Sequence, residues 1–326
     1  MRCIISQSNN PHFNLSAEEY FLRNSDEEFF FLYINEPCIV VGKHQNLLSE
    51  INLRFVTDHN IKLARRISGG GAVYQDLNNL NFSFIHNAAN PDQLNFPKFT
   101  APVLNALKDM GLAAEFSGRN DLLIDSGKVS GNAMHIFKSR ILSHGTLLFN
   151  SDLNCLSEAL KNHPERYIDK SIKSVRSKVT NISKYLGNSI SMELFCKYIF
   201  NNITEKLINI NTKHIDNQEI IFINHLLEEK FSTWDWIYGY SPKYVFKNGF
   251  SCSDQRINLE LNVEKGIITN IKTDLDLLSG PECQHSIKLL NGVKHDYTTI
   301  TELLKNDDFL KSSPSFSIFK FCENLF

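Results

Sequence analysis

Apolar residues along the first hundred positions follow the patterns of interior strands and amphipathic helices. Two nearly continuous apolar runs, at 28–35 and 38–41, predict interior strands. Ser16 and Glu19 have the spacing of a capping box, so a helix is expected to begin near Ser16. The other elements expected here are a helix at 51–60, strands at 61–66, 72–74 and 80–86, and an amphipathic helix at 99–110.

The middle of the chain has both β-type and helical patterns. Strands with turns at Gly118, Gly127 and Gly131 are expected within 113–150, and helices at 153–160 and 191–208. Residues 165–190 lack clean periodicity and are rich in Ser, Lys and Asn. Such a long polar connection is typical of a functional lid or of a disordered segment.

A change of pattern near Lys247 indicates a second domain. Apolar residues alternate strictly with polar ones over 257–263, and the segment 267–272 returns after a Glu-Lys-Gly turn, which predicts a hairpin. Helical patterns follow near 282–290 and 298–304. We therefore expect an α/β (α+β) fold of mixed sheets and helices, with a large domain at 1–246 and a small α+β domain at 247–326.

Composition narrows the class of protein. Of 326 residues, 42% are hydrophobic and 21% charged, which supports a packed core and argues against disorder. The formal net charge of −2 gives no sign of a nucleic-acid partner. The seven cysteines form no CxxC pair, and the N-terminus lacks an apolar signal segment. We expect a soluble cytoplasmic protein, although an organellar protein that has lost its presequence would have the same features.

Three consecutive glycines, Gly69 to Gly71, follow the pair Arg65-Arg66. Glycines allow backbone N–H groups to approach an anion closely, and arginine is a bidentate donor to phosphate or carboxylate. The alternative is a tight turn with arginines facing solvent. The segment matches neither the P-loop nor the dinucleotide-binding glycine pattern, so a nucleotide would be held in another way.

A second polar cluster contains Asn120-Asp121, Lys128 and His144. Lys128 lies between turn glycines on a short β segment, so its long cationic side chain starts from a rigid base. Asp121 is a candidate to help hold hydrated Mg²⁺ beside phosphates. Taken singly, a surface lysine, a turn-capping aspartate and a core histidine are at least as probable.

The order of these motifs resembles that in lipoate–protein ligases. The matching segments are Gly42–Asn46, Arg65–Asp76, Gly118–Leu122, Lys128–Ala133, His144–Leu148, Ser174–Asn181 and Trp234–Gly239. The resemblance covers nearly the whole chain and implies a catalytic domain of the kind shared with biotin ligases, followed by an accessory domain.

The resemblance implies a role for each candidate residue. Lys128 would be catalytic and contact both ATP and lipoate. The expected adenylate site consists of Arg66, Gly71, Ala72, Val73, Tyr74, Asn120, Asp121, Lys128 and Arg176. The expected lipoate site consists of Leu15, Val41, Arg65, Ser68, Gly69, Gly70, Lys128 and His144. Residues 174–181 would form the adenylate-binding loop and close over the intermediate.

The implied reaction uses ATP, Mg²⁺ and lipoic acid, and it passes through lipoyl-AMP. The implied acceptors are lipoyl domains of 2-oxoacid dehydrogenase complexes or the glycine cleavage H protein, with no nucleic acid or membrane involved. A lipoyltransferase that uses preformed lipoyl-AMP, or an acyl chain from another carrier, remains open. So does a non-catalytic lipoate- or nucleotide-binding protein. A biotin ligase is disfavoured because its Gly/Arg-rich adenylate loop is not found.

Overall fold

The computed structural model describes residues 1–88, 96–118, 120–175, 177–187, 190–252, 255–274, 280–313 and 316–326. The chain forms two units. Unit 1 contains residues 1–42, 61–157 and 174–233, and unit 2 contains 43–60, 158–173 and 234–326. The expected boundary at residue 247 falls within strand β13 (Tyr244–Cys252), and two earlier segments also join unit 2.

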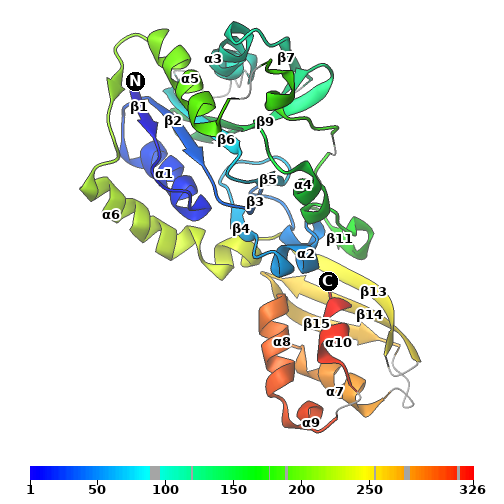
Figure 1. Ribbon diagram of the computed structural model, residues 1–326. Coiled ribbons are helices and arrows are strands. Elements are labelled where there is room, and N and C mark those ends of the chain that lie inside the picture. Colours follow the sequence, from blue (N-terminus) through cyan, green and yellow to red (C-terminus); the bar gives the residue numbers. More distant parts are fainter. Residues whose placement is uncertain are drawn as a thin grey trace. The chain divides into compact units, whose positions relative to one another are not determined.

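Unit 1 is built on an eight-stranded mixed sheet in the order β12-β1-β2-β6-β10-β9-β8-β7 (Figure 1). These strands are β1 (Arg2–Ile5), β2 (Phe29–Ile34), β6 (Asn79–Asn87), β7 (Ala114–Ser117), β8 (Asp121–Ile124), β9 (Gly127–Phe137), β10 (Arg140–Leu148) and β12 (Asn211–Thr212). A second, three-stranded sheet has the order β4-β3-β5, from β3 (Cys38–Val41), β4 (Lys62–Arg65) and β5 (Val73–Gln75).

Helices pack on both sides of the large sheet. The described α-helices of unit 1 are α1 (Pro11–Asn24), α3 (Phe96–Asp109), α5 (Met192–Glu205) and α6 (Asn217–Leu226), and α4 (Leu153–Ala159) begins in unit 1 and ends in unit 2. Helices α3 and α5 bury Val103 and Phe195 in one core with Phe30, Phe82 and Phe84 of the sheet. Helix α1 contacts β6 and β10 of the large sheet and β4 of the small one, so it lies between the two sheets.

Unit 2 contains a four-stranded antiparallel sheet in the order β11-β13-β14-β15 (Figure 1). Its other strands are β11 (Tyr167–Asp169), β14 (Gln255–Glu264) and β15 (Ile267–Thr273), and its described α-helices are α2 (Leu53–Asp58), α7 (Pro281–Leu289), α8 (Tyr297–Asn306), α9 (Asp308–Lys311) and α10 (Ile318–Glu323). The predicted hairpin is confirmed, because Lys265 and Gly266 both have positive φ, as a tight two-residue turn requires.

Most of the other predicted elements are confirmed within a few residues, and two predictions are wrong. Helix α1 begins at Pro11 and not near Ser16, because the Asn10 side chain accepts from the His12 amide and caps the helix. Ser16 lies inside the helix, where its hydroxyl donates to the His12 carbonyl. Gly131 forms no turn but lies within β9.

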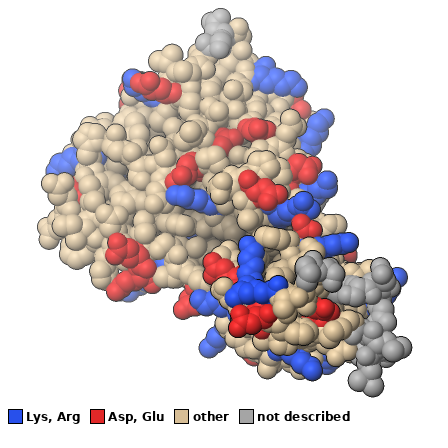
Figure 2. All heavy atoms as spheres, turned by 60° about the horizontal axis from the view of Figure 1, so that its bottom comes forward, with Lys and Arg blue, Asp and Glu red and all other residues tan. Residues whose placement is uncertain are grey.

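The surface carries charges of both signs. Figure 2 shows basic and acidic side chains interspersed on the face drawn, in keeping with the formal net charge of −2. Across the residues that the structure describes, none of the helices combines the length and the apolar character that crossing a bilayer requires.

Candidate functional site

The glycine turn, residues Ser68 to Ala72, connects β4 to β5 in unit 1. Gly70 has a φ of +91°, a conformation that favours glycine. A Cβ on Gly42, at the end of β3, would clash with the carbonyl oxygen of Gly70. The two glycines therefore allow the turn to lie directly against the backbone at the end of β3.

Arg66 holds the carbonyl groups of the glycine turn. Its Nη2 donates to the carbonyl oxygens of Gly69 at 2.7 Å and Gly71 at 2.8 Å, and its Nη1 donates to that of Val40 at 3.0 Å. Burial lowers the pKa of Arg66 to about 10, so the guanidinium stays charged at neutral pH. The neighbouring Arg65 is fully buried and donates to the Gly42 carbonyl.

These hydrogen bonds determine where the amide groups of the turn point. In a planar trans peptide the N–H is opposite the carbonyl. Because the carbonyls of Gly69 and Gly71 face Arg66, the N–H groups of Gly70 and Ala72 face away from it. The Ala72 amide donates to the Ser174 hydroxyl at 2.9 Å. The turn thus presents backbone donors of the kind that bind anions.

A β-bulge in β9 directs the side chain of Lys128. Leu122 pairs with Ser130 whereas Leu123 pairs with Lys128, so Val129 is an extra residue in the strand. An extra residue reverses the side-chain alternation. Lys128 therefore lies on the same face as Gly131, and a Cβ on Gly131 would be 3.2 Å from its Nζ.

The ammonium of Lys128 and the glycine turn lie over one face of β9. A Cβ on Gly70 would be 4.0 Å from the Cβ of Ala133, which shares a face with Gly131. These two β9 positions are about 7 Å apart along the strand. Lys128 Nζ pairs with Asp121 Oδ1 at 2.9 Å, and both side chains are about a quarter exposed. Cation, carboxylate and amide donors therefore line one surface.

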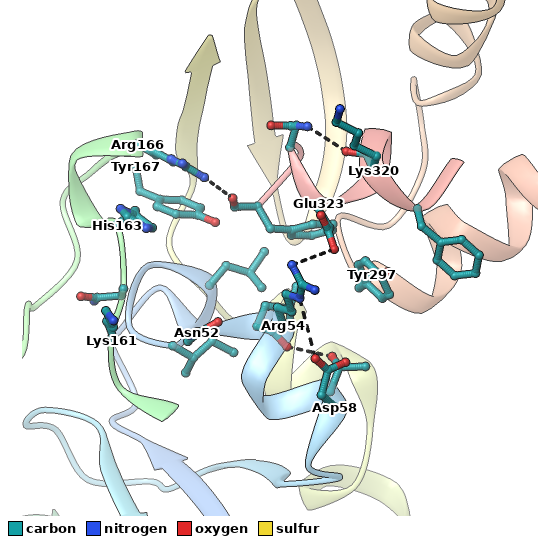
Figure 3. A pocket seen from close by; sticks show the side chains of 18 residues that line it. Asn52, Arg54, Asp58, Lys161, His163, Arg166, Tyr167, Tyr297, Lys320 and Glu323 are labelled. Carbon is teal, nitrogen blue, oxygen red and sulfur yellow. Dashed lines mark hydrogen bonds and ion pairs between the residues drawn. The ribbon is translucent and has the colours of Figure 1, made fainter. Parts of the chain in front are cut away.

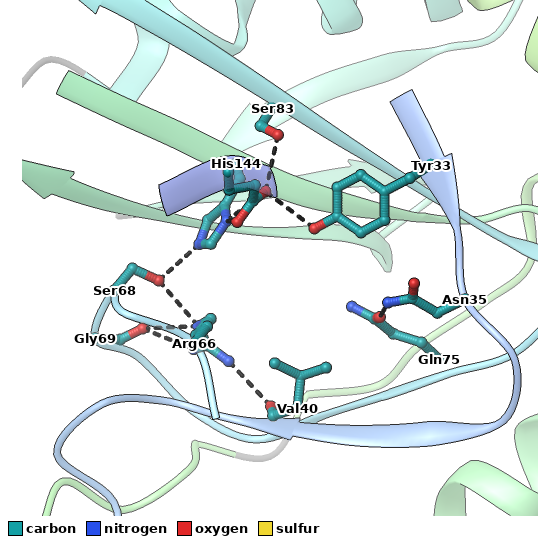
Figure 4. A network of polar contacts seen from close by, with 10 residues as sticks. Tyr33, Asn35, Val40, Arg66, Ser68, Gly69, Gln75, Ser83 and His144 are labelled. Atoms are coloured by element: carbon teal, nitrogen blue, oxygen red, sulfur yellow. Dashed lines mark hydrogen bonds and ion pairs between the residues drawn. The ribbon is translucent and has the colours of Figure 1, made fainter. Parts of the chain in front are cut away.

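A buried hydrogen-bond network lies behind the glycine turn (Figure 4). The Ser68 hydroxyl is 2.6 Å from His144 Nε2, and His144 Nδ1 is 2.9 Å from Glu18 Oε2. Glu18 Oε1 also accepts from the hydroxyls of Tyr33 at 3.0 Å and Ser83 at 2.8 Å. All five side chains are buried, so His144 contacts the turn through Ser68.

Part of the expected adenylate loop contacts the same site. The Ser174 hydroxyl accepts from the Ala72 amide, and an added Cβ on Gly71 would be 2.9 Å from Ser174 Oγ. Val179 forms a parallel bridge to Lys128, with the Lys128 amide donating to Lys178 and the Thr180 amide donating to Lys128. Arg176, which was expected to bind the adenylate, lies outside the described residues.

Four other predicted site residues are of two kinds: two are apolar core residues, and two have side chains hydrogen-bonded to neighbouring residues. Leu15 and Val41 are buried in unit 1. Burial and a side-chain hydrogen bond to Cys155 raise the pKa of Tyr74. Because this side chain is buried, only the Tyr74 backbone is suited to contact a ligand. Asn120 precedes β8, and its side-chain amide and its carbonyl exchange hydrogen bonds with the carbonyl and the side-chain amide of Asn132 in β9.

Sequence reasoning missed Glu18, Tyr33 and Ser83. The signal available in the sequence was a glutamate, Glu18, among the apolar positions of a predicted helix. In the structure the Glu18 side chain is only 1% exposed. An almost fully buried carboxylate requires hydrogen-bond donors, and its partners are distant in the sequence.

A separate concavity of about 820 Å³ lies within unit 2 (Figure 3). Arg54 pairs there with Asp58 and with Glu323, and Arg166 donates to the carbonyl of Phe326. Among its described lining residues, the concavity lacks a glycine-rich backbone turn beside its cations. In unit 1 the amide donors of the glycine turn and the Lys128 ammonium lie over one face of β9, which makes this face the better candidate site for a phosphorylated ligand.

Comparison with known proteins defines the class. The family model of the lipoyl protein ligase A/B catalytic domain matches residues 10–204. The chain is 40% identical to "Lipoate--protein ligase 1" of Staphylococcus aureus over 308 residues, which covers 93% of this chain and 94% of the relative. The chain therefore belongs to the lipoate–protein ligase A family, and it is an enzyme of the ligase class.

Solved structures agree with this assignment. A P. falciparum protein solved in complex with lipoate is 28% identical, with a TM-score of 0.62, and the match covers 97% of this chain and 98% of that one. A lipoate–protein ligase A solved with bound ATP is 26% identical, with a TM-score of 0.64, over 73% of this chain and 98% of that one. The predicted fold class is confirmed.

Proposed function

We propose that the enzyme joins lipoate to ATP at the face of β9 and then transfers the lipoyl group to an acceptor lysine. The observation that carries the proposal is the placement of the Lys128 ammonium on the same strand face as the glycine turn. The relatives solved with lipoate and with ATP support both substrates. Lys128 would contact the lipoate carboxylate and an α-phosphate oxygen together.

The charges of the substrates explain the need for Lys128. Lipoate and ATP are both anionic, and a fixed cation between them offsets their repulsion and stabilises the transition state. The lipoate oxygen forms a bond to the α-phosphorus while the bond from that phosphorus to pyrophosphate breaks. The deprotonated ε-amine of the acceptor then attacks the acyl carbon, and AMP leaves.

Asp121 is the proposed carboxylate ligand for Mg²⁺, which would neutralise the departing pyrophosphate. Mg²⁺ commonly uses one or two carboxylates together with substrate phosphates and water, and Asp121 is partly exposed on the site face. Within the described ranges, no group of three or more His, Cys, Asp or Glu side chains could hold a metal ion. A single partly exposed carboxylate fits a metal that is also held by substrate phosphates.

We further propose that unit 1 carries the catalytic site and that residues 247–326 of unit 2 are accessory. Within unit 1, the proposed adenylate contacts are Arg66, Gly71, Ala72, Val73, Tyr74, Asn120, Asp121 and Lys128, and the proposed lipoate contacts are Leu15, Val41, Arg65, Ser68, Gly69, Gly70, Lys128 and His144. The proposed acceptors are lipoyl domains of 2-oxoacid dehydrogenase complexes or the glycine cleavage H protein. The scattered cysteines favour the cytoplasm as the compartment.

The test is a mass measurement of a purified lipoyl domain incubated with the enzyme, lipoate, ATP and Mg²⁺. The proposal predicts a lipoyl mass increase on one lysine that requires ATP. A lipoyltransferase would modify the domain with supplied lipoyl-AMP but not with lipoate and ATP. A binding protein would modify it under neither condition.

A further inference from the structure

Glu18 is an almost fully buried carboxylate with a complete set of donors. It receives hydrogen bonds from His144, Tyr33 and Ser83, at distances of 2.8–3.0 Å. Because an ionised carboxylate only accepts hydrogen bonds, the donating Nδ1 of His144 carries a proton. In a neutral ring, Nε2 then accepts the hydroxyl proton of Ser68.

The network continues from Ser68 to the glycine turn. The Ser68 oxygen accepts from Arg66 Nε at 3.1 Å, and the same guanidinium holds the carbonyls of Gly69 and Gly71. Glu18 also attracts the Arg66 cation electrostatically. A buried guanidinium is costly unless an anion compensates it, so the carboxylate helps to keep Arg66 charged in place.

The Glu18–His144–Ser68 order has the geometry of a nucleophilic triad, but Ser68 is poorly suited to attack. Its side chain is 1% exposed, and its oxygen already accepts from Arg66 Nε. A nucleophile needs a free lone pair directed at a substrate. Orientation of Arg66 is the function that these contacts support.

We propose that Glu18 is a positioning residue for the adenylate site. Through His144 and Ser68 it fixes Arg66, which in turn directs the amide groups of Gly70 and Ala72 towards the ligand. This inference rests on the proposed function for its catalytic consequence. Its structural consequence, a rigid glycine turn in the free enzyme, can be measured without any substrate.

The experiment compares Glu18→Gln with Tyr33→Phe in the full chain. Glu18→Gln keeps the side-chain shape and removes the charge. Tyr33→Phe removes a different hydrogen-bond donor to Glu18 and leaves the contact between Glu18 and His144 in place. We expect amide hydrogen exchange at residues 69–72 to be about tenfold faster in Glu18→Gln than in Tyr33→Phe, as for loss of a hydrogen bond to a charged group.

Enzyme kinetics and a second variant complete the test. In Glu18→Gln the KM for ATP should rise about tenfold while kcat falls less, because Lys128 is untouched. Ser68→Ala interrupts the network without changing a charge, and it should loosen residues 69–72 in the same way. The variant that combines Glu18→Gln with Ser68→Ala should then show exchange rates at residues 69–72 close to those of either single variant.

Each result has a defined meaning. The proposal is overturned if the amide exchange rates at residues 69–72 are unchanged in both Glu18→Gln and Ser68→Ala. It is also overturned if Tyr33→Phe increases these rates as much as Glu18→Gln does. If Glu18→Gln loosens the turn but the unmodified enzyme shows no lipoate-dependent pyrophosphate exchange, the positioning role stands and the proposed function fails.

Discussion

Replacing Gly131 with valine should inactivate the enzyme without unfolding it. A Cβ at this position would be 3.2 Å from both Cε and Nζ of Lys128, closer than the contact distance of about 3.5–4.0 Å between nonbonded atoms. The two further methyl groups of valine would displace the ammonium more than the Cβ alone. The direct result is a misplaced Lys128.

The expected magnitudes for stability and activity differ widely. The ion pair between Lys128 and Asp121 is partly exposed, so its loss costs roughly 0–1 kcal/mol. Replacing a strand glycine recovers about 0.5–1 kcal/mol of backbone entropy, so the net change in folding free energy is small. Misplacing a reacting group by about 1 Å can reduce a rate about 100-fold.

Single-turnover formation of lipoyl-AMP is the assay, with thermal unfolding measured in parallel. Gly187→Ala is the matched control, because an added Cβ there would meet no described atom within 4 Å. Adding Lys128→Ala to Gly131→Val should cause little further loss. A Gly131→Val enzyme with the unmodified rate would refute the placement of Lys128 over Gly131.

Three further predictions concern other parts of the chain. Gly70→Val should abolish calorimetric binding of ATP and lipoate, because φ is +91° and the Cβ would be 2.9 Å from Arg66 Nη2; unchanged affinities would make the triplet only a turn. A non-hydrolysable lipoyl-AMP analogue should slow amide exchange at residues 177–182, and equal protection with and without it would refute a closing loop. Burial lowers the pKa of His295 to about 4 from its usual 6.5, so the unfolded state binds a proton first as the pH falls. Unfolding free energy should therefore fall by roughly 2 kcal/mol between pH 7 and 5, and the fall should be smaller in His295→Gln; equal falls would contradict this.

Local sequence chemistry was sufficient for much of the fold. The alternation before Lys265 and Gly266 predicted a hairpin because side-chain period and turn geometry are both local properties. The position of the glycine triplet is likewise a local property, whereas its role in binding an anion stays a prediction. By contrast, the predicted start of α1 was wrong. Ser16 and Glu19 match the spacing of a capping box, but Asn10 caps the helix earlier and Pro11 is its first residue.

The arrangement of the site could not be predicted from local patterns. The network behind the glycine turn joins α1, β6, β10 and the β4–β5 connection, which only the folded sheets bring together. The bulge at Val129 likewise depends on pairing with β8. Without it, simple alternation would have placed Lys128 and Gly131 on opposite faces.

The central claim is most directly tested by lipoate-dependent exchange of pyrophosphate into ATP. The unmodified enzyme should catalyse exchange only when lipoate and Mg²⁺ are present, because the first reaction step is reversible. Lys128→Ala should lower the exchange rate on the order of 10²–10³-fold while remaining folded. Exchange that does not depend on lipoate, or a near-normal rate in folded Lys128→Ala, would contradict the account.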